Sequence, residues 1–178
     1  MNLSNIIVKT IMNGRFFMLN KAKYSLFTLL MIMVLSACTS NESMQDNLVS
    51  PTFAIPVMFD GEEGQNILRG EQGKLGFLIG SGLEKEEVEL LPLVANEPNK
   101  YMWHFWGQDL NGKSLKVIGT NIETNEEAVI IDNYNIAGAL NGADAHVPSS
   151  MVFPNSGIWE LDVYVEKELF GNVVVEVQ

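Results

Sequence analysis

The sequence predicts an all-β domain in which two antiparallel sheets pack as a sandwich. Several segments alternate apolar and polar residues with a period of two, which is typical of strands with one buried and one solvated face. These segments are short, and turn-forming stretches such as Asp109 to Gly112 and Pro154 to Gly157 separate them. Short strands spaced by such turns favour a β-sandwich.

The clearest strand runs from Ile158 to Val165. Alternation places one apolar set on a single face, made of Trp159, Leu161, Val163 and Val165. The opposite face carries Glu160, Asp162 and Tyr164. A turn near Glu166 and Lys167 allows residues 169–177 to return antiparallel beside it. We therefore predict a C-terminal hairpin with one face in the core.

Upstream of this hairpin, the same reasoning predicts strands at residues 74–79, 100–107, 114–119, 128–131 and 147–153. One segment, residues 83–91 (LEKEEVELL), is charged and has closely spaced glutamates. It fits either a short helix or a solvated strand, and the sequence leaves the two open.

The predicted strand at 100–107 (KYMWHFWG) is unusual because both of its faces are apolar or aromatic. Its parity places Tyr101, Trp103 and Phe105 on one face, and Met102, His104 and Trp106 on the other. One face belongs to the core, so a loop, an edge element or a ligand must cover the second. If no protein element covers it, the second face is a platform on which a sugar ring or a partner's apolar segment stacks.

The N-terminal region is typical of a bacterial export signal. Lys9, Arg15, Lys21 and Lys23 precede an uncharged, mostly apolar run at 24–37. That run of about 14 residues is shorter than the roughly 20 that a membrane-spanning helix needs. It ends in Leu-Ser-Ala-Cys at 35–38, which matches the lipobox of bacterial lipoproteins. We expect residues 1–37 to be a lipoprotein signal peptide, with Met1 and Met18 as alternative starts.

Cys38 is then the lipidation site, carrying diacylglycerol with or without an N-acyl chain, and no other cofactor is expected. It is the only cysteine, so no internal disulfide can form. Residues 38–50 are polar and are expected to be a flexible, disordered tether to a domain at 51–178. These features predict a protein anchored on the extracytoplasmic face of the cell membrane.

The net charge of the chain disfavours some classes of binding partner. The chain has a net charge of −11, with 11 basic and 22 acidic residues. The leader holds four of the basic residues and no acidic one, so the remainder has 7 basic and 22 acidic residues, which gives −15. Such a surface repels phosphate backbones, so nucleic acid is not an expected partner, and anionic lipids and polymers are disfavoured.

Two segments resemble an uncharacterised family of small Gram-positive, Bacillus-type lipoproteins with an immunoglobulin-like domain of unknown function. They are MWHFWG at 102–107 and MVFPNSGIWELDVYVEKELFGNVVVEV at 151–177. The resemblance covers most of the chain after the leader. It implies an immunoglobulin-like β-sandwich and an envelope location, and it supplies no catalytic residues.

The sequence contains no catalytic motif. The glycines around Gly73-Lys74 do not form a P-loop, because Leu68 and Leu75 occupy positions that need glycine and serine or threonine. No Gly-x-Ser-x-Gly elbow accompanies His104 or His146, so a hydrolase triad is disfavoured. We expect a non-enzymatic module that binds an envelope protein or a polysaccharide, with an envelope hydrolase as the weakest alternative.

A metal-handling role is the second hypothesis. His104 and His146, joined by Met102 or Met151, offer ligands that suit copper or zinc. The competing interpretation is that His104 is an ordinary strand residue whose ring a backbone group satisfies. The sequence does not show whether the two histidines lie close together.

Overall fold

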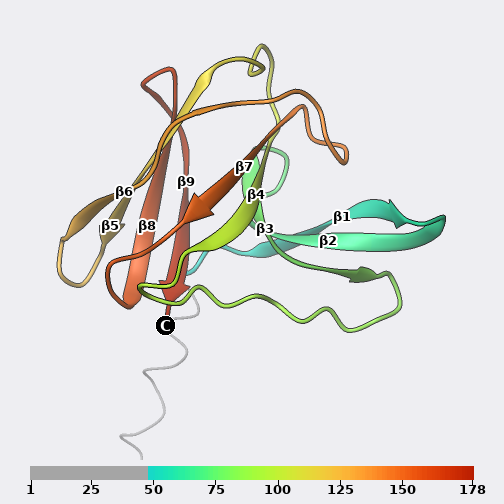
Figure 1. The fold of residues 1–178 in the computed structure, drawn as a ribbon, viewed down its shortest axis with the longest axis horizontal. Coiled ribbons are helices and arrows are strands. Elements are labelled where there is room, and N and C mark those ends of the chain that lie inside the picture. The colour runs from blue at the N-terminus through green and yellow to red at the C-terminus, as the bar shows by residue number, and fades with distance from the viewer. Residues whose placement is uncertain (1–47) are drawn as a thin grey trace, which may run out of the picture. The chain divides into compact units, whose positions relative to one another are not determined.

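The computed structural model describes residues 48–178, which fold as nine strands in two sheets (Figure 1). The strands are β1 (Thr52–Phe59), β2 (Glu62–Glu71), β3 (Leu75–Leu83), β4 (Asn99–Phe105), β5 (Ser114–Asn121), β6 (Glu127–Asn135), β7 (Ala145–Met151), β8 (Gly157–Val165) and β9 (Glu168–Val177). Within that range no segment is helical. The predicted signal peptide, Cys38 and most of the predicted tether lie outside the described residues.

Among residues 48–178, no helix has the length and apolar character needed to cross a bilayer.

The strand order confirms the antiparallel β-sandwich. One sheet has the order β1-β2-β3-β4-β7 and the other β6-β5-β8-β9. The neighbours β4 and β7 are separated along the chain by β5 and β6, which belong to the opposite sheet. In immunoglobulin nomenclature, β3, β4 and β7 correspond to strands A, B and E of one sheet. In the other sheet, β5, β6, β8 and β9 correspond to strands C, C′, F and G. This is an immunoglobulin-like order without strand D, to which β1 and β2 are added.

The predicted C-terminal hairpin is confirmed. β8 and β9 pair antiparallel from Gly157 with Val177 to Val165 with Glu168. The turn residues Glu166 and Lys167 both have positive φ, at 51° and 73°, as a two-residue type I′ turn requires. The apolar face predicted for β8 is buried, and Trp159, Leu161 and Val163 are fully inaccessible.

Aromatic side chains from both sheets form the centre of the core. Phe77 of β3 packs against Trp103 of β4 with ring centroids 5.0 Å apart. From the second sheet, Trp159 meets Phe153 edge to face at 5.8 Å. The indole nitrogen of Trp159 donates a hydrogen bond to the carbonyl of Asn155, so its burial leaves no polar group unpaired.

The first two strands were not predicted. β1 and β2 form a hairpin that projects from the sandwich in Figure 1 and turns at Asp60-Gly61, with φ of 50° and 92°. Asp-Gly is a common type I′ turn sequence, but Pro56 lies inside β1 and weakens the strand signal. Proline is tolerated here because β1 is an edge strand.

Residues 83–91 form neither the short helix nor the solvated strand that the sequence allowed. After Leu83 the chain is a loop that lies against β3. A Cβ atom added to Gly80 would come within 2.8 Å of Val88, so the missing side chain makes room for the loop. The amide of Leu91 donates to the carbonyl of Ile79 at 2.7 Å, and Leu93 bridges Val177 in parallel. The loop therefore joins the two sheets at one edge.

Candidate functional site

The candidate residues gather on the outer face of the five-stranded sheet, which we define as the face that points away from the core. As predicted, Tyr101, Trp103 and Phe105 are buried on the core face. Met102 and His104 lie on the outer face of β4, Trp106 follows directly after the strand, and His146 lies on β7.

His104 and His146 are direct cross-strand neighbours in the β4–β7 pair. The amide and carbonyl of His146 both bond to Ala137, on the side away from β4, at 3.1 and 2.8 Å. The histidines are therefore a non-hydrogen-bonded pair, in which Cα atoms approach to about 4.5 Å and side chains are closest. The structure brings the two imidazoles together on one face.

The two rings have different hydrogen-bond environments. Nδ1 of His146 lies 2.7 Å from the carbonyl oxygen of Gly138. A carbonyl only accepts, so Nδ1 carries the proton and the neutral ring keeps its lone pair on Nε2. His104 is fully buried, and neither of its ring nitrogens has a hydrogen-bond partner within the described part of the chain.

Burial lowers the pKa of His104, because it penalises the charged ring. The backbone of Met102 acts in the opposite direction, although no atom there meets hydrogen-bond geometry, and the charge of His146 lowers the pKa further. His104 is therefore neutral near pH 7. By distance and angle, no backbone group among the described residues bonds the ring, so the geometry does not show the partner that the competing interpretation expected.

Phe53 of β1 explains why His104 is inaccessible. Its ring lies over Gly76, where an added Cβ would be 3.1 Å away, and Gly76 is the β3 neighbour of His104. Phe53 also packs on Trp106 at 5.9 Å. Trp106 in turn lies 6.4 Å from His104, with the two rings nearly parallel, and its indole nitrogen donates to the carbonyl of Gly142. Met102, His104 and Trp106 therefore do not form one open platform, because an edge strand covers its centre.

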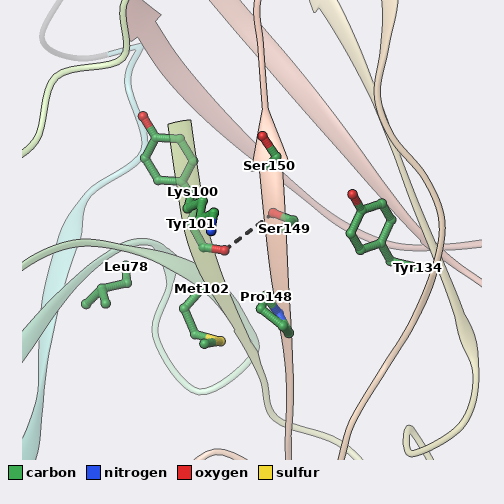
Figure 2. A pocket seen from close by; sticks show the side chains of 8 residues that line it. All are labelled: Leu78, Lys100, Tyr101, Met102, Tyr134, Pro148, Ser149 and Ser150. Carbon is green, nitrogen blue, oxygen red and sulfur yellow. Dashed lines mark hydrogen bonds between the residues drawn. The ribbon is translucent and has the colours of Figure 1, made fainter. Parts of the chain in front are cut away.

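An open groove of about 480 Å³ remains next to Met102 (Figure 2). It is lined by Leu78, Lys100, Tyr101, Met102, Tyr134, Pro148, Ser149 and Ser150. In Figure 2, Tyr134 stands on the far side of β7 from Met102, with Pro148 between them. Ser149 donates to the carbonyl of Tyr101 and so belongs to the strand pairing. The groove combines apolar side chains with a rim of hydroxyl groups and one ammonium group.

Sequence reasoning missed Tyr134. The predicted strand ended at residue 131, whereas β6 continues to Asn135 and carries Tyr134 beside β7. Tyr134 is 38% exposed, so its ring is accessible from solvent. Tyr134 lies between two polar residues, Asn133 and Asn135, which gives this end of the strand no alternation of apolar and polar residues.

A second groove of about 610 Å³ lies on the outer face of the other sheet. Tyr164 and Lys167 line it, together with Lys116 and Asp132, whose charged groups are 3.8 Å apart. This groove differs from the first in holding charges of both signs, which partly pair with each other.

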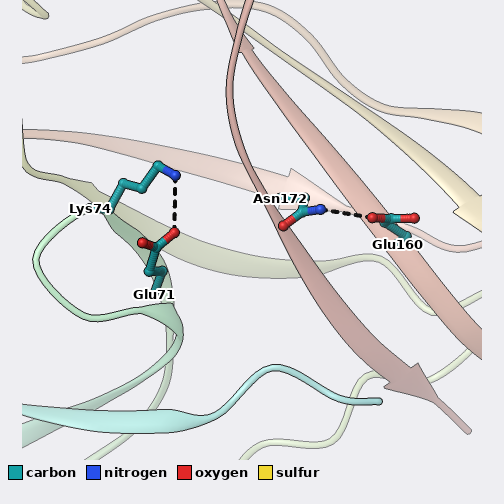
Figure 3. A network of polar contacts seen from close by, with 4 residues as sticks. All are labelled: Glu71, Lys74, Glu160 and Asn172. Atoms are coloured by element: carbon teal, nitrogen blue, oxygen red, sulfur yellow. Dashed lines mark hydrogen bonds and ion pairs between the residues drawn. The ribbon is translucent and has the colours of Figure 1, made fainter.

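The polar contacts in Figure 3 do not belong to either groove. Lys74 pairs with Glu71 at 3.0 Å across the β2–β3 turn, and Asn172 donates to Glu160 at 2.7 Å between β9 and β8. The side chains of the ion pair are 42% and 60% exposed, and such surface pairs contribute about 0–1 kcal/mol. They support local strand pairing.

The described residues contain no group of three or more His, Cys, Asp or Glu side chains arranged to hold a metal ion. Of the two methionines considered as ligands, Met151 is buried in the core and cannot join the histidines. Met102 lies on their face of the sheet, two residues from His104. A metal site at His104 and His146 remains a hypothesis.

Comparison with known proteins gives a family match and a structural match. Residues 61–175 match the domain of unknown function DUF4871. The crystal structure of a "Putative Lipoprotein from Bacillus anthracis" is similar with a TM-score of 0.48 and 19% sequence identity, covering 83% of this chain and 92% of that one. No curated protein matches the chain.

Proposed function

Since the chain belongs to the DUF4871 family, whose function is unknown, we propose that it is a lipid-anchored, non-catalytic module that binds a polysaccharide of the cell envelope. The observation that carries this proposal is the open groove beside Met102, where the exposed ring of Tyr134 stands next to an apolar surface and a polar rim.

The groove suits a sugar chain chemically. A sugar ring has an apolar face that stacks on an aromatic ring, and Tyr134 supplies that ring together with a hydroxyl group. Lys100 and Ser150 can hydrogen-bond the sugar's hydroxyl groups from the rim. Lys100 is the only charged side chain that lines the groove, whereas the part of the chain after the leader has a net charge of −15, which disfavours a polyanion.

The anchor is supported by the sequence of the leader. The basic segment, the apolar run at 24–37 and the lipobox ending at Cys38 together fit export, cleavage and acylation. Two or more acyl chains would hold the domain firmly at the membrane surface, within reach of wall polymers.

The absence of a catalytic role is supported by the surroundings of the two histidines. Among the described residues, His146 bonds only to a backbone carbonyl and His104 to nothing, so neither activates a serine or is oriented by a carboxylate. A triad needs both contacts.

The test uses the full-length protein and purified cell-wall sacculi from which anionic polymers have been removed. In co-sedimentation, Tyr134→Ala should weaken binding about tenfold, since aromatic stacking contributes about 0.5–1.5 kcal/mol beyond area burial. Tyr164→Ala is the matched control, because it removes the same side chain from the second groove. Absence of binding by the parent, or a loss confined to Tyr164→Ala, would contradict the proposal.

A further inference from the structure

We infer that His104 and His146 form a two-imidazole binding site for Cu(I). The inference concerns the histidine pair beneath Phe53 and is independent of sugar binding in the groove. It begins from the register of β4 and β7, which makes the two histidines a non-hydrogen-bonded pair with adjacent side chains.

His104 points to a ligand because its ring is buried and unpartnered. Buried polar side chains almost always have a hydrogen-bond partner, and an exception calls for an explanation such as an ion. Both ring nitrogens of His104 are unpaired among residues 48–178, and the ring is fully inaccessible. A metal ion bound to one of these nitrogens would satisfy the ring.

His146 is already oriented as a ligand. The carbonyl of Gly138 accepts the hydrogen bond from Nδ1, which fixes the tautomer and leaves the Nε2 lone pair free. Metal-binding histidines commonly have such a backbone carbonyl behind them, because it fixes the ring and increases its basicity. His146 is only half-buried, so an ion can reach the pair from its side.

The donor atoms available at the two histidines determine which metal ion fits the site. Two imidazoles lie together, and the thioether of Met102 is on the same face, whereas no cluster of three His, Cys, Asp or Glu is present in the described range. Structural zinc takes four such ligands, and calcium and magnesium take oxygen. Cu(I) accepts imidazole and thioether, and it is stable with only two or three ligands.

The apolar surroundings of the two histidines favour a metal ion of low charge. Phe53 and Trp106 form an apolar wall beside His104: the two aromatic rings pack on each other at 5.9 Å, and the ring of Trp106 lies 6.4 Å from that of His104. Burying charge without compensation is unfavourable, so a monovalent ion fits this site better than Cu(II) or Zn(II).

The experiment titrates the full-length chain with Cu(I) alone, without oxygen and in competition with a chromogenic Cu(I) chelator. The chain carries Cys38→Ser, so that the lone thiol cannot bind the metal. We expect one Cu(I) per chain, and an affinity at least 100-fold lower in both His146→Ala and His104→Phe. Tyr164→Ala, which removes a half-exposed aromatic side chain from the other sheet, is the control and should bind like the parent.

Circular dichroism checks that each variant is folded. If His104→Phe does not fold, His146→Ala decides alone, because its half-exposed side chain is less important for packing. X-ray absorption of the loaded parent should show nitrogen ligands from two imidazoles. The inference is overturned if the parent does not compete with the chelator, if His146→Ala binds as tightly as the parent, or if Tyr164→Ala loses binding equally.

Discussion

Truncation of Trp159 tests the assignment of β8 as the central strand of the core. The indole is fully buried, stacks edge to face on Phe153 at 5.8 Å and donates a 3.1 Å hydrogen bond to the carbonyl of Asn155. It also fills the space above Gly119, where an added Cβ would lie 3.1 Å from the ring. Trp159→Ala therefore opens a cavity and removes a hydrogen bond.

The expected loss in the free energy of unfolding is large. Truncating a buried tryptophan to alanine costs about 3–5 kcal/mol, and typical domains have only about 5–15 kcal/mol in total. For a domain of this size, each kcal/mol lowers the melting temperature by about 3–4 °C, which predicts a decrease of roughly 10–20 °C. Trp159→Phe keeps most of the ring and should lose only about 1–2 kcal/mol, including the lost hydrogen bond.

Urea and thermal unfolding followed by circular dichroism measure these losses without using tryptophan as the probe. Tyr164→Ala is the control, because Tyr164 lies on the opposite face of the same strand and is half-exposed. If Trp159→Ala melts within about 2 °C of the parent, a size that surface substitutions typically produce, then β8 does not face the core.

Three further predictions concern pH, the last turn and the anchor. Because burial holds the pKa of His104 below its ordinary value, the unfolded chain binds a proton that the folded chain does not. Metal-free protein should have its full stability above about pH 6.5 and lose stability as the pH falls below it, and His104→Phe should reduce this slope in urea titrations. Lys167→Gly should raise the urea midpoint by stabilising the protein by roughly 0.5–1 kcal/mol, because Lys167 has a φ of 73° that glycine adopts without strain. Cys38→Ser should move the protein from the membrane to the soluble fraction, and persistence in the membrane would contradict the proposed anchor.

The sequence predicted those strands in which apolar and polar residues alternate along the chain. β8 is an example, since its apolar residues recur at every second position. β2 (EEGQNILRGE) has only two large apolar residues, and they are consecutive, so no alternation was visible. The cover over His104 was unpredictable for the same reason, because Phe53 belongs to β1, and its position over Gly76 depends on pairing between distant segments.

The proximity of the two histidines could not be predicted from the sequence. Both residues were recognised as candidates, but their proximity depends on the register of β4 and β7. The bridge between Ala137 and His146, which sets the orientation of the β7 backbone, lies in a segment without sequence periodicity. Tyr134 needed the same kind of information, since only the pairing of β5 with β6 extends that strand to Asn135.

Among the described residues, Ser50 connects the start of the domain to β9, which bears on how the domain would carry mechanical load. Ser50, which the sequence placed in the flexible tether, donates its amide to the carbonyl of Val174, and its hydroxyl oxygen accepts from the amide of the same residue. Arg69 adds a third bond, to the carbonyl of Ser50. If the domain is anchored through Cys38 as proposed, a pull on Ser50 therefore acts on its contact with Val174 of β9 before it acts on β1. Together the three bonds connect the residue before β1 to β9 of one sheet and to β2 of the other, so such a pull would load both sheets.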